Sequence, residues 1–213
     1  MVVNIEWGAF DPERKVLPYT IYDHKLNRES VEPDQQPFEK MISNLYLGEI
    51  VRNVILSLVD LRLIFSGQSS QELNQAGALT NSLPSILADR SENLEETSRV
   101  LEELEISTVW VDRQMVKCIS SWVVSRAARL TACGVAAILS DSLQKEPTRI
   151  AIGGSVYELF PDFEKQLLDN LDELLGGLAK DVQLDLVREN IGLGAAIIAL
   201  MAHQASLLQG PLR

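Results

Sequence analysis

The sequence contains few cysteines and comparatively few basic residues, and both shortages narrow the classes of protein it can belong to. Only two cysteines occur among 213 residues, Cys118 and Cys133, without any spacing typical of a metal site. Both lie in apolar, helix-like stretches, so we expect free, buried thiols in a reducing, cytoplasmic compartment. The 19 Lys and Arg are outnumbered by 30 Asp and Glu, which gives a net charge of −11. This balance argues against a nucleic-acid partner, because phosphate contacts need clustered cations.

Two segments bear on targeting and membrane association. The chain begins MVVNIEWG, without the basic segment that opens a secretory signal peptide, so we expect no signal. An uncharged stretch over 190–212 is long enough to be weighed as a membrane span. Five polar residues interrupt this stretch, namely Asn190, His203, Gln204, Ser206 and Gln209. We therefore favour a buried helix and predict no membrane span.

The order of patterns along the chain indicates an α/β architecture. Apolar residues make up 46% of the sequence, enough for a sizeable core. Trp110 and Trp122 are expected in that core. The predicted elements, in order, are a strand at 2–7, a long helix from Pro37, short acidic helices within 84–106, a long helix over 112–143, a strand, glycine turn and second strand over 149–159, a helix over 162–178, a strand over 182–187 and a helix that follows a glycine turn over 189–209.

The segment NIEWGAF, residues 4–10, looks like part of a binding site. Glu6 stands between an expected strand residue, Ile5, and the pair Trp7 and Gly8. A strand end that presents a carboxylate beside an aromatic ring and a glycine is typical of a ligand contact, although Glu6 alone also fits a solvated strand end. A site normally has more chain in front of it than these few residues.

Six ordered blocks resemble the eukaryotic hexokinases, and the fungal forms most closely. The blocks are NIEWGAF, Tyr22–Asp23, QQPFEKMISNLYLGEIVR, SRAARLTACGVAAI, IAIGGSVYELFP and GLGAAIIA, and only residues 60–110 match weakly. The resemblance implies the actin-like ATPase (ribonuclease H-like) fold, with residues 1–213 as its large C-terminal domain. It also implies carbohydrate metabolism, through ATP-dependent phosphorylation of a hexose such as glucose at the 6-hydroxyl, with Mg²⁺.

Three segments of that family have no counterpart in this sequence. They are a first phosphate loop of the Asp-x-Gly-Gly-Thr-Asn type, an Asn-Asp-Thr segment with the catalytic Asp, and a glycine-threonine loop before the EWG block. In the family all three precede the position of Met1. We therefore expect a large domain without the small N-terminal domain, assign no catalytic residue and no metal ligand within the chain, and expect the chain alone to be inactive.

The resemblance implies that Glu6, Gln36 and Glu39 contact the sugar. Carboxylates suit this role because a sugar presents hydroxyl donors and charge-assisted hydrogen bonds are strong. Pro37 suits the first position of a helix, which places Glu39 in its first turn. Taken alone, Glu39 also fits an ordinary acidic residue at a helix start.

On the nucleotide side, the resemblance implies contacts to ATP from Ser125, Gly154, Ser155, Gly192 and Gly194. The sequence departs from the family pattern in the same blocks, with Asn44, Asn190 and Ile191 in place of Gly, Gly and Ser, and with Gly153 and Arg188 in place of acids. Two alternatives stay open. One is a kinase with weakened nucleotide binding, and the other is a non-catalytic, sugar-responsive regulator or interaction module with a protein partner.

Overall fold

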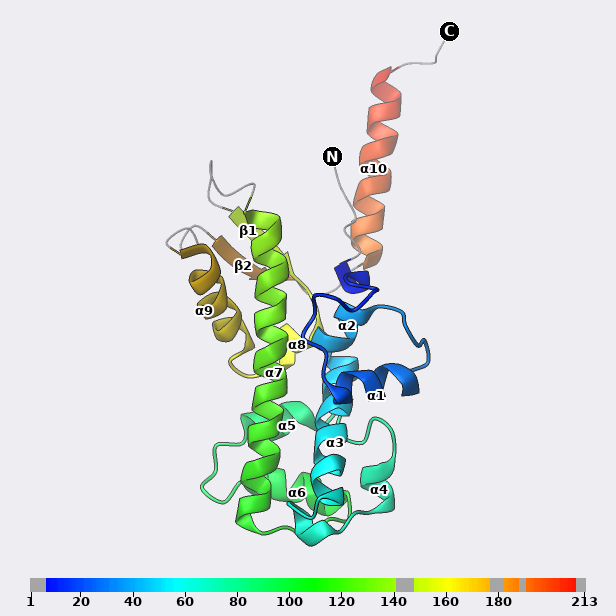
Figure 1. Cartoon of the computed structure of the whole chain (residues 1–213). Helices are drawn as coiled ribbons and strands as arrows, with labels where there is room; N and C mark the ends of the chain where they lie inside the picture. Colours follow the sequence, from blue (N-terminus) through cyan, green and yellow to red (C-terminus); the bar gives the residue numbers. More distant parts are fainter. Residues whose placement is uncertain (1–6, 141–147, 177–181, 188–190, 210–213) are drawn as a thin grey trace.

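The fold is a layer of helices against a small parallel sheet, with one long helix running through the molecule (Figure 1). A computed structural model describes residues 7–140, 148–176, 182–187 and 191–209. The elements are η1 Trp7–Ala9, α1 Ile21–Glu29, α2 Pro37–Ile42, α3 Asn44–Asp60, η2 Phe65–Gly67, α4 Gln71–Asn74, α5 Leu83–Ala88, α6 Glu95–Glu103, α7 Trp110–Leu139, β1 Thr148–Ile152, α8 Ser155–Leu159, α9 Phe163–Leu175, β2 Val182–Leu186 and α10 Ile191–Gln209.

The helix predicted from Pro37 forms, but as two helices. Pro37 occupies the start of α2, as predicted. The chain then leaves helical geometry at Ser43, which is extended with φ −86° and ψ 139°, and α3 begins at Asn44. The apolar face of α3, including Ile50 and Ile55, packs into the main core with α7. The break lets α2 turn toward another part of the molecule while α3 stays in the core.

The sheet consists, among the described residues, of two parallel strands. β1 pairs with β2 in a register that places Ile150 opposite Leu184. Alternate apolar residues of both strands pack against α7 and against Leu167 and Leu171 of α9. The predicted second strand over 155–159 is wrong, because this segment is helix α8. Gly154 turns the chain with φ +132°, a conformation that other residues rarely adopt, and the helix starts directly after it.

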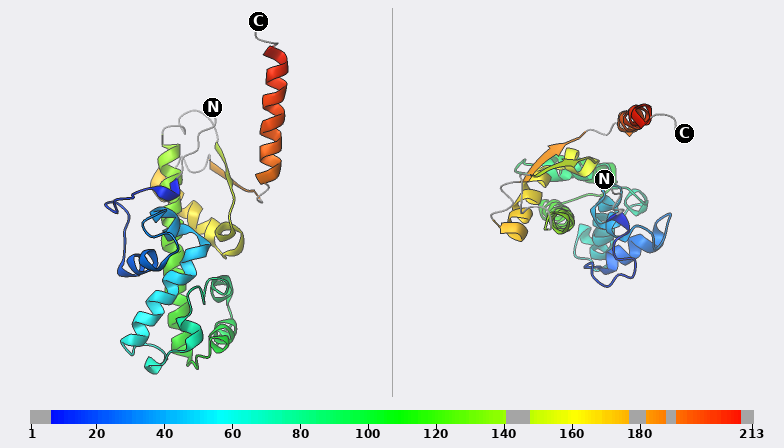
Figure 2. Two further views of the ribbon diagram at one scale, coloured as in Figure 1. Left: turned by 90° about the vertical axis from the view of Figure 1, so that its right-hand side faces the viewer. Right: turned by 90° about the horizontal axis from the view of Figure 1, so that it is seen from above.

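Helix α7 is the axis of the molecule (Figures 1 and 2). It is the one described helix that is long and apolar enough to cross a membrane, and its packing in the core accounts for that composition, since Ala127, Ala128 and Ala132 are completely buried. Its other side is open to solvent. Trp110 and Trp122 are 45% and 69% exposed, so the expectation that they are core residues is wrong.

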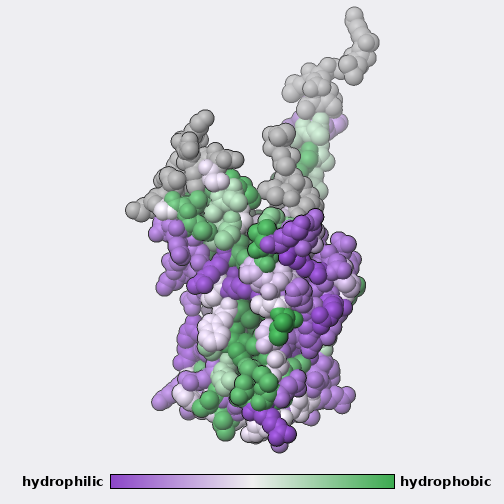
Figure 3. Space-filling view, viewed as in Figure 1, coloured by the Kyte–Doolittle hydropathy of each residue, from purple (hydrophilic) through white to green (hydrophobic). Residues whose placement is uncertain are grey.

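Two further expectations about burial are also wrong. Cys118 and Cys133 are free, as expected, but both thiols lie on the exposed side of α7. The helix predicted near the C-terminus is present as α10, yet its residues 194–204 are exposed and the helix projects from the body (Figures 1 and 3). The apolar composition of α10 predicted a helix covered by other elements, but the described part of the chain leaves residues 194–204 exposed.

Candidate functional site

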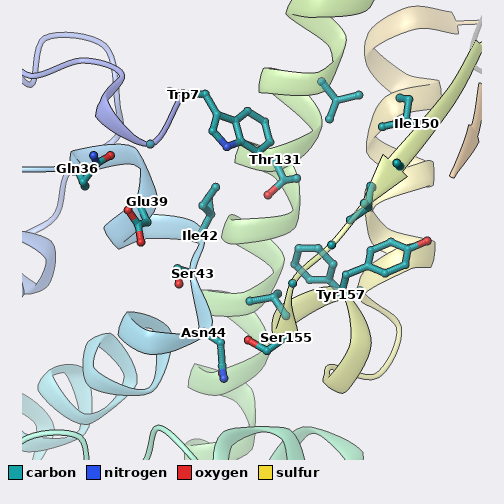
Figure 4. A pocket seen from close by; sticks show the side chains of 18 of the residues that line it. Trp7, Gln36, Glu39, Ile42, Ser43, Asn44, Thr131, Ile150, Ser155 and Tyr157 are labelled. Atoms are coloured by element: carbon teal, nitrogen blue, oxygen red, sulfur yellow. The ribbon is translucent and has the colours of Figure 1, made fainter. Parts of the chain in front are cut away.

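A cleft of ≈ 810 Å³ lies between η1 and α2 on one side and β1 and α8 on the other, with α7 behind it (Figure 4). Its lining combines polar groups with apolar side chains. The described lining residues are Trp7, Gly8, Gln36, Glu39, Ile42, Ser43, Asn44, Thr131, Val135, Ile138, Ile150, Ala151, Ile152, Gly153, Gly154, Ser155, Val156, Tyr157 and Phe163. This is the shape and chemistry of a small-molecule site.

Gln36 and Glu39 reach the cleft from the N-terminal end of α2. Gln36 precedes the helix in a left-handed conformation, with φ 49° and ψ 52°, and Glu39 lies in the first turn. Gly8 approaches both side chains closely, since a Cβ at this position would lie 2.6 Å from the Oε1 of Gln36 and 3.3 Å from the Cβ of Glu39. The structure therefore brings the Trp7–Gly8 pair of the NIEWGAF block beside two of the predicted sugar contacts. Glu6, the third, lies outside the described residues.

Trp7 fixes this edge of the cleft. Its ring meets the ring of Phe38 edge to face, with centroids 5.4 Å apart. It also lies against α7 at Gly134, where an added Cβ would come within 2.7 Å of the Cζ3 atom of Trp7. Because α7 has only a hydrogen at this point, the indole can pack directly on its backbone. The sequence predicted the importance of the Trp-Gly pair but did not indicate the matching glycine on α7.

The opposite side of the cleft is the turn that joins β1 to α8. Gly153 and Gly154 form this turn, and Ser155 begins α8. Tyr157 lines the same side, and burial, followed by the nearby Glu164 carboxylate, raises the pKa of its phenol. Thr131 of α7 lies between the two sides, and its hydroxyl donates a hydrogen bond of 2.9 Å to the carbonyl of Ala127. Sequence reasoning did not single out Thr131 or Tyr157, although both fall inside blocks that it used.

Asn44 lies where the two sides meet. It is the first residue of α3 and lines the cleft, and its Oδ1 atom is buried without a hydrogen-bond partner. A buried amide oxygen without a partner is unfavourable. In Figure 4 the side chain lies at the end of the cleft where Ser155 also lies.

The predicted nucleotide residues do not all gather in the cleft. Gly154 and Ser155 line it. Ser125 faces α9 instead, where its hydroxyl donates to the Oε1 of Gln166 at 2.6 Å. Gly192 and Gly194 lie in the first turn of α10, and nothing comes within 4 Å of a Cβ built on either one. Two substituted positions of the same blocks, Arg188 and Asn190, lie outside the described residues.

The charge within the cleft is sparse. Glu39 is the only carboxylate among the described lining residues. Within the described parts of the chain, no group of three or more His, Cys, Asp and Glu residues is arranged to hold a metal ion. What the described lining residues offer is one anionic acceptor, several neutral polar groups and an aromatic edge.

Comparisons with known proteins identify relatives of this chain. A family model described as hexokinase matches residues 1–201. The hexokinase of Kluyveromyces lactis is 38% identical over 211 residues, and hexokinase-2 of Saccharomyces cerevisiae is 36% identical over 211 residues. In both cases the match covers 96% of this chain and 43% of the relative. The chain therefore spans less than half the length of the curated relatives it matches.

Solved structures show the same relationship. A hexokinase from Schistosoma mansoni complexed with glucose superposes with a TM-score of 0.74 at 31% identity, over 87% of this chain and 42% of that one. A second hexokinase crystal structure gives a TM-score of 0.72 at 25% identity. The fold is thus the actin-like ATPase fold, as the sequence blocks predicted. The match over nearly all of the sequence, together with the shared fold, shows that this chain belongs to the hexokinase family.

Proposed function

We propose that this chain supplies the sugar-binding wall of an ATP-dependent hexose kinase and that residues 1–213 are its large domain. The observation that carries the proposal is the convergence of Trp7, Gly8, Gln36 and Glu39 on one side of a single cleft. The relationship to a hexokinase crystallised with glucose supports a hexose as the ligand.

The chemistry of this wall suits a ring of hydroxyl groups. The Glu39 carboxylate can accept hydrogen bonds from two hydroxyls, and such charge-assisted bonds are stronger than neutral ones. The Gln36 side chain can both donate and accept, so it can bind a hydroxyl in either orientation. Trp7 adds an apolar edge beside them. Together these groups would hold and orient a sugar.

We also propose that these 213 residues do not phosphorylate the sugar alone. Transfer of a phosphoryl group to a hydroxyl uses a general base near that hydroxyl and a metal ion on the phosphates. Glu39 is the only carboxylate among the described residues of the cleft, and it is assigned to holding the sugar. Gly154 and Ser155 would face the nucleotide, and ATP when bound would supply the phosphoryl group.

The second candidate function is a non-catalytic, sugar-responsive regulator that acts through a protein partner. Asn44 and Gly153 favour it, because both stand in the cleft at positions where the resemblance implies other residues. Asn44 fills space beside the turn that would face the nucleotide, and Gly153 carries no side chain for a ligand to contact. In such a protein the sugar side would function without the nucleotide side.

Calorimetry with glucose on the 213-residue chain tests the sugar assignment. We expect measurable heat, and a Glu39→Gln variant should bind roughly tenfold to a hundredfold more weakly, as expected for losing a charged acceptor. The matched control is Glu29→Gln, an exposed residue at the end of α1 outside the cleft, which should bind like the parent chain. No heat at millimolar glucose would refute the sugar site.

A coupled assay for sugar phosphate separates the two candidate functions. On the longest chain that the gene yields, turnover would support the kinase, whereas sugar binding without turnover would support the regulator. On the 213 residues alone we expect no appreciable turnover. Rapid phosphorylation of the sugar by this chain would refute the proposal that it is inactive alone.

We further propose a cytoplasmic location. The two thiols of the chain are free and solvent-exposed, a state that reducing compartments maintain. Imaging of the tagged chain in cells tests this location, and secretion or a membrane-bound pool would contradict it.

A further inference from the structure

A buried polar network connects α1, the loop before α2 and Lys40 of α2, the segment that carries Gln36 and Glu39. Its centre is Asn27 of α1, a residue that is only 3% exposed. The Nδ2 of Asn27 donates to the Oδ1 of Asp34 at 2.9 Å, and its Oδ1 accepts the backbone N–H of Asp34 at 3.0 Å. One amide group therefore holds the loop before α2 at both its side chain and its backbone. Arg14 makes an ion pair with the same Asp34 carboxylate.

Lys40 ties this loop to α2. The residue follows Glu39 in the helix and is 4% exposed, although it is a lysine. Its Nζ donates to the Oδ1 of Asn27 at 3.0 Å and to the backbone carbonyl of Glu32 at 2.6 Å. Burial lowers the pKa of Lys40, and the nearby Arg14 lowers it further. The Asp34, Glu32 and Glu39 carboxylates offset part of these effects, and two oxygens accept hydrogen bonds from the ammonium group.

The loop that this network holds carries unusual backbone geometry. Asp34 and Gln36 both have positive φ, at 66° and 49°, although neither is glycine. Such conformations persist only where the surrounding structure fixes them. The backbone carbonyl of Gln36 also accepts the N–H of Lys40 at 3.1 Å, so the two residues share the first turn of α2. Neither Asn27 nor Lys40 is among the residues that line the cleft.

From these contacts we infer that Asn27 and Lys40 are positioning residues for sugar recognition, which hold Gln36 in its left-handed conformation and so aim its amide at the ligand without touching it. The inference rests on the proposed sugar site. A purely structural network would stabilise the fold but would not act through one particular contact residue.

A double-mutant cycle tests this link. Lys40→Met keeps the length of the side chain but removes its donors, and we expect glucose binding to weaken about fivefold, as for the loss of one hydrogen bond. In a Gln36→Ala background the same change should alter binding less than about twofold, because the group that Lys40 positions is already gone. An equal loss in both backgrounds would overturn the inference. Lys165→Met, an exposed lysine on α9, is the matched control.

A measurement without sugar distinguishes failure of this inference from failure of the proposed function. In the free chain, ¹⁵N relaxation of the Gln36 amide should show a rigid order parameter of about 0.85, falling below about 0.6 in Lys40→Met. If the parent chain binds no glucose but Gln36 loosens in this way, the sugar site fails while the positioning role stands. If Gln36 stays rigid in the variant, the positioning role is wrong regardless of sugar binding.

Circular dichroism shows whether the Lys40→Met variant is folded, and this result decides whether it can be used in the cycle. If it is not, Asn27→Ser, which removes the oxygen that Lys40 and Asp34 share, is measured in the same cycle and with the same relaxation experiment. If Asn27→Ser weakens glucose binding in the parent chain but hardly changes it in the Gln36→Ala background, the inference is supported. If it weakens binding equally in both backgrounds, the inference is wrong.

Discussion

Replacing Gly8 with alanine should separate sugar binding from stability. The added methyl group would lie 2.6 Å from the Oε1 of Gln36, which is closer than the two atoms can approach, and 3.3 Å from the Cβ of Glu39. The nearest obstacle is the end of a flexible side chain, so Gln36 can rotate away and the backbone can stay in place. The φ of Gly8 lies outside the left-handed region, so alanine is not strained there.

The expected magnitudes follow from this geometry. If the Gln36 amide no longer reaches the ligand, about 1 kcal/mol of binding is lost, which weakens the affinity for glucose about fivefold. The free energy of unfolding should change by less than about 1 kcal/mol, since alanine also restricts the unfolded chain. Gly134→Ala is the contrasting variant, because its methyl group would meet the rigid indole of Trp7 at 2.7 Å. We expect that variant to lose about 1–3 kcal/mol of stability.

Calorimetry with glucose and urea denaturation measure the two quantities. An unchanged affinity in Gly8→Ala would refute the assignment of Gln36 as a sugar contact in this conformation. A loss of stability as large as that of Gly134→Ala would refute the argument that the Gln36 side chain gives way.

Three further predictions concern regions outside the cleft. Arg126→Met removes the two hydrogen bonds, of 2.7 and 2.8 Å, that Arg126 donates to the Asp23 carboxylate, which is 2% exposed and keeps only its bonds from Thr20. This change should cost about 3 kcal/mol by urea denaturation at pH 7, and a loss below about 1 kcal/mol would contradict it. Burial alone would raise the pKa of Asp89, but hydrogen bonds from neighbouring hydroxyls and amides lower it to about 2. Stability from this group is therefore present above about pH 4 and should fall by roughly 2 kcal/mol toward pH 2. Asp89→Asn should remove that part of the acid-unfolding curve, and an unaltered curve would contradict the assignment. Because α10 exposes apolar side chains, we expect the chain to self-associate through this helix. Ile198→Lys with Met201→Lys, at two exposed positions of α10, should then increase the monomeric fraction in light scattering, and unchanged association would contradict this expectation.

Local chemistry predicted the long helices but missed where they break, and the shorter helices α1 and α4 lie in segments that were predicted to be irregular. Pro37 marked the start of α2 because its missing N–H costs nothing at a first helical position. The break at Ser43 was not predicted, because the apolar spacing continues from Met41 to Leu47 as if one helix ran through. The segment after Gly154 was predicted as a strand on similar grounds, but the turn geometry set by that glycine starts a helix instead.

The site could be predicted only through the family resemblance. No spacing in the sequence relates Gln36 to Gly154, although both line the cleft, the first from the start of α2 and the second from the turn between β1 and α8. Burial was the least predictable property. We predicted core positions for the residues of α10 and for the two tryptophans of α7 because apolar side chains are usually buried. Residue type alone does not show whether another element is present to cover them.

The placement of Trp7 gives the molecule an optical probe of its own cleft. Trp7 is one of three tryptophans and is the only one among the described lining residues, while Trp110 and Trp122 lie on the solvent side of α7. A molecule that enters the cleft changes the surroundings of one indole and leaves the emission of the other two as a constant background. Conversion of those two to phenylalanine would leave a single fluorophore, whose spectrum reports occupancy of the site directly.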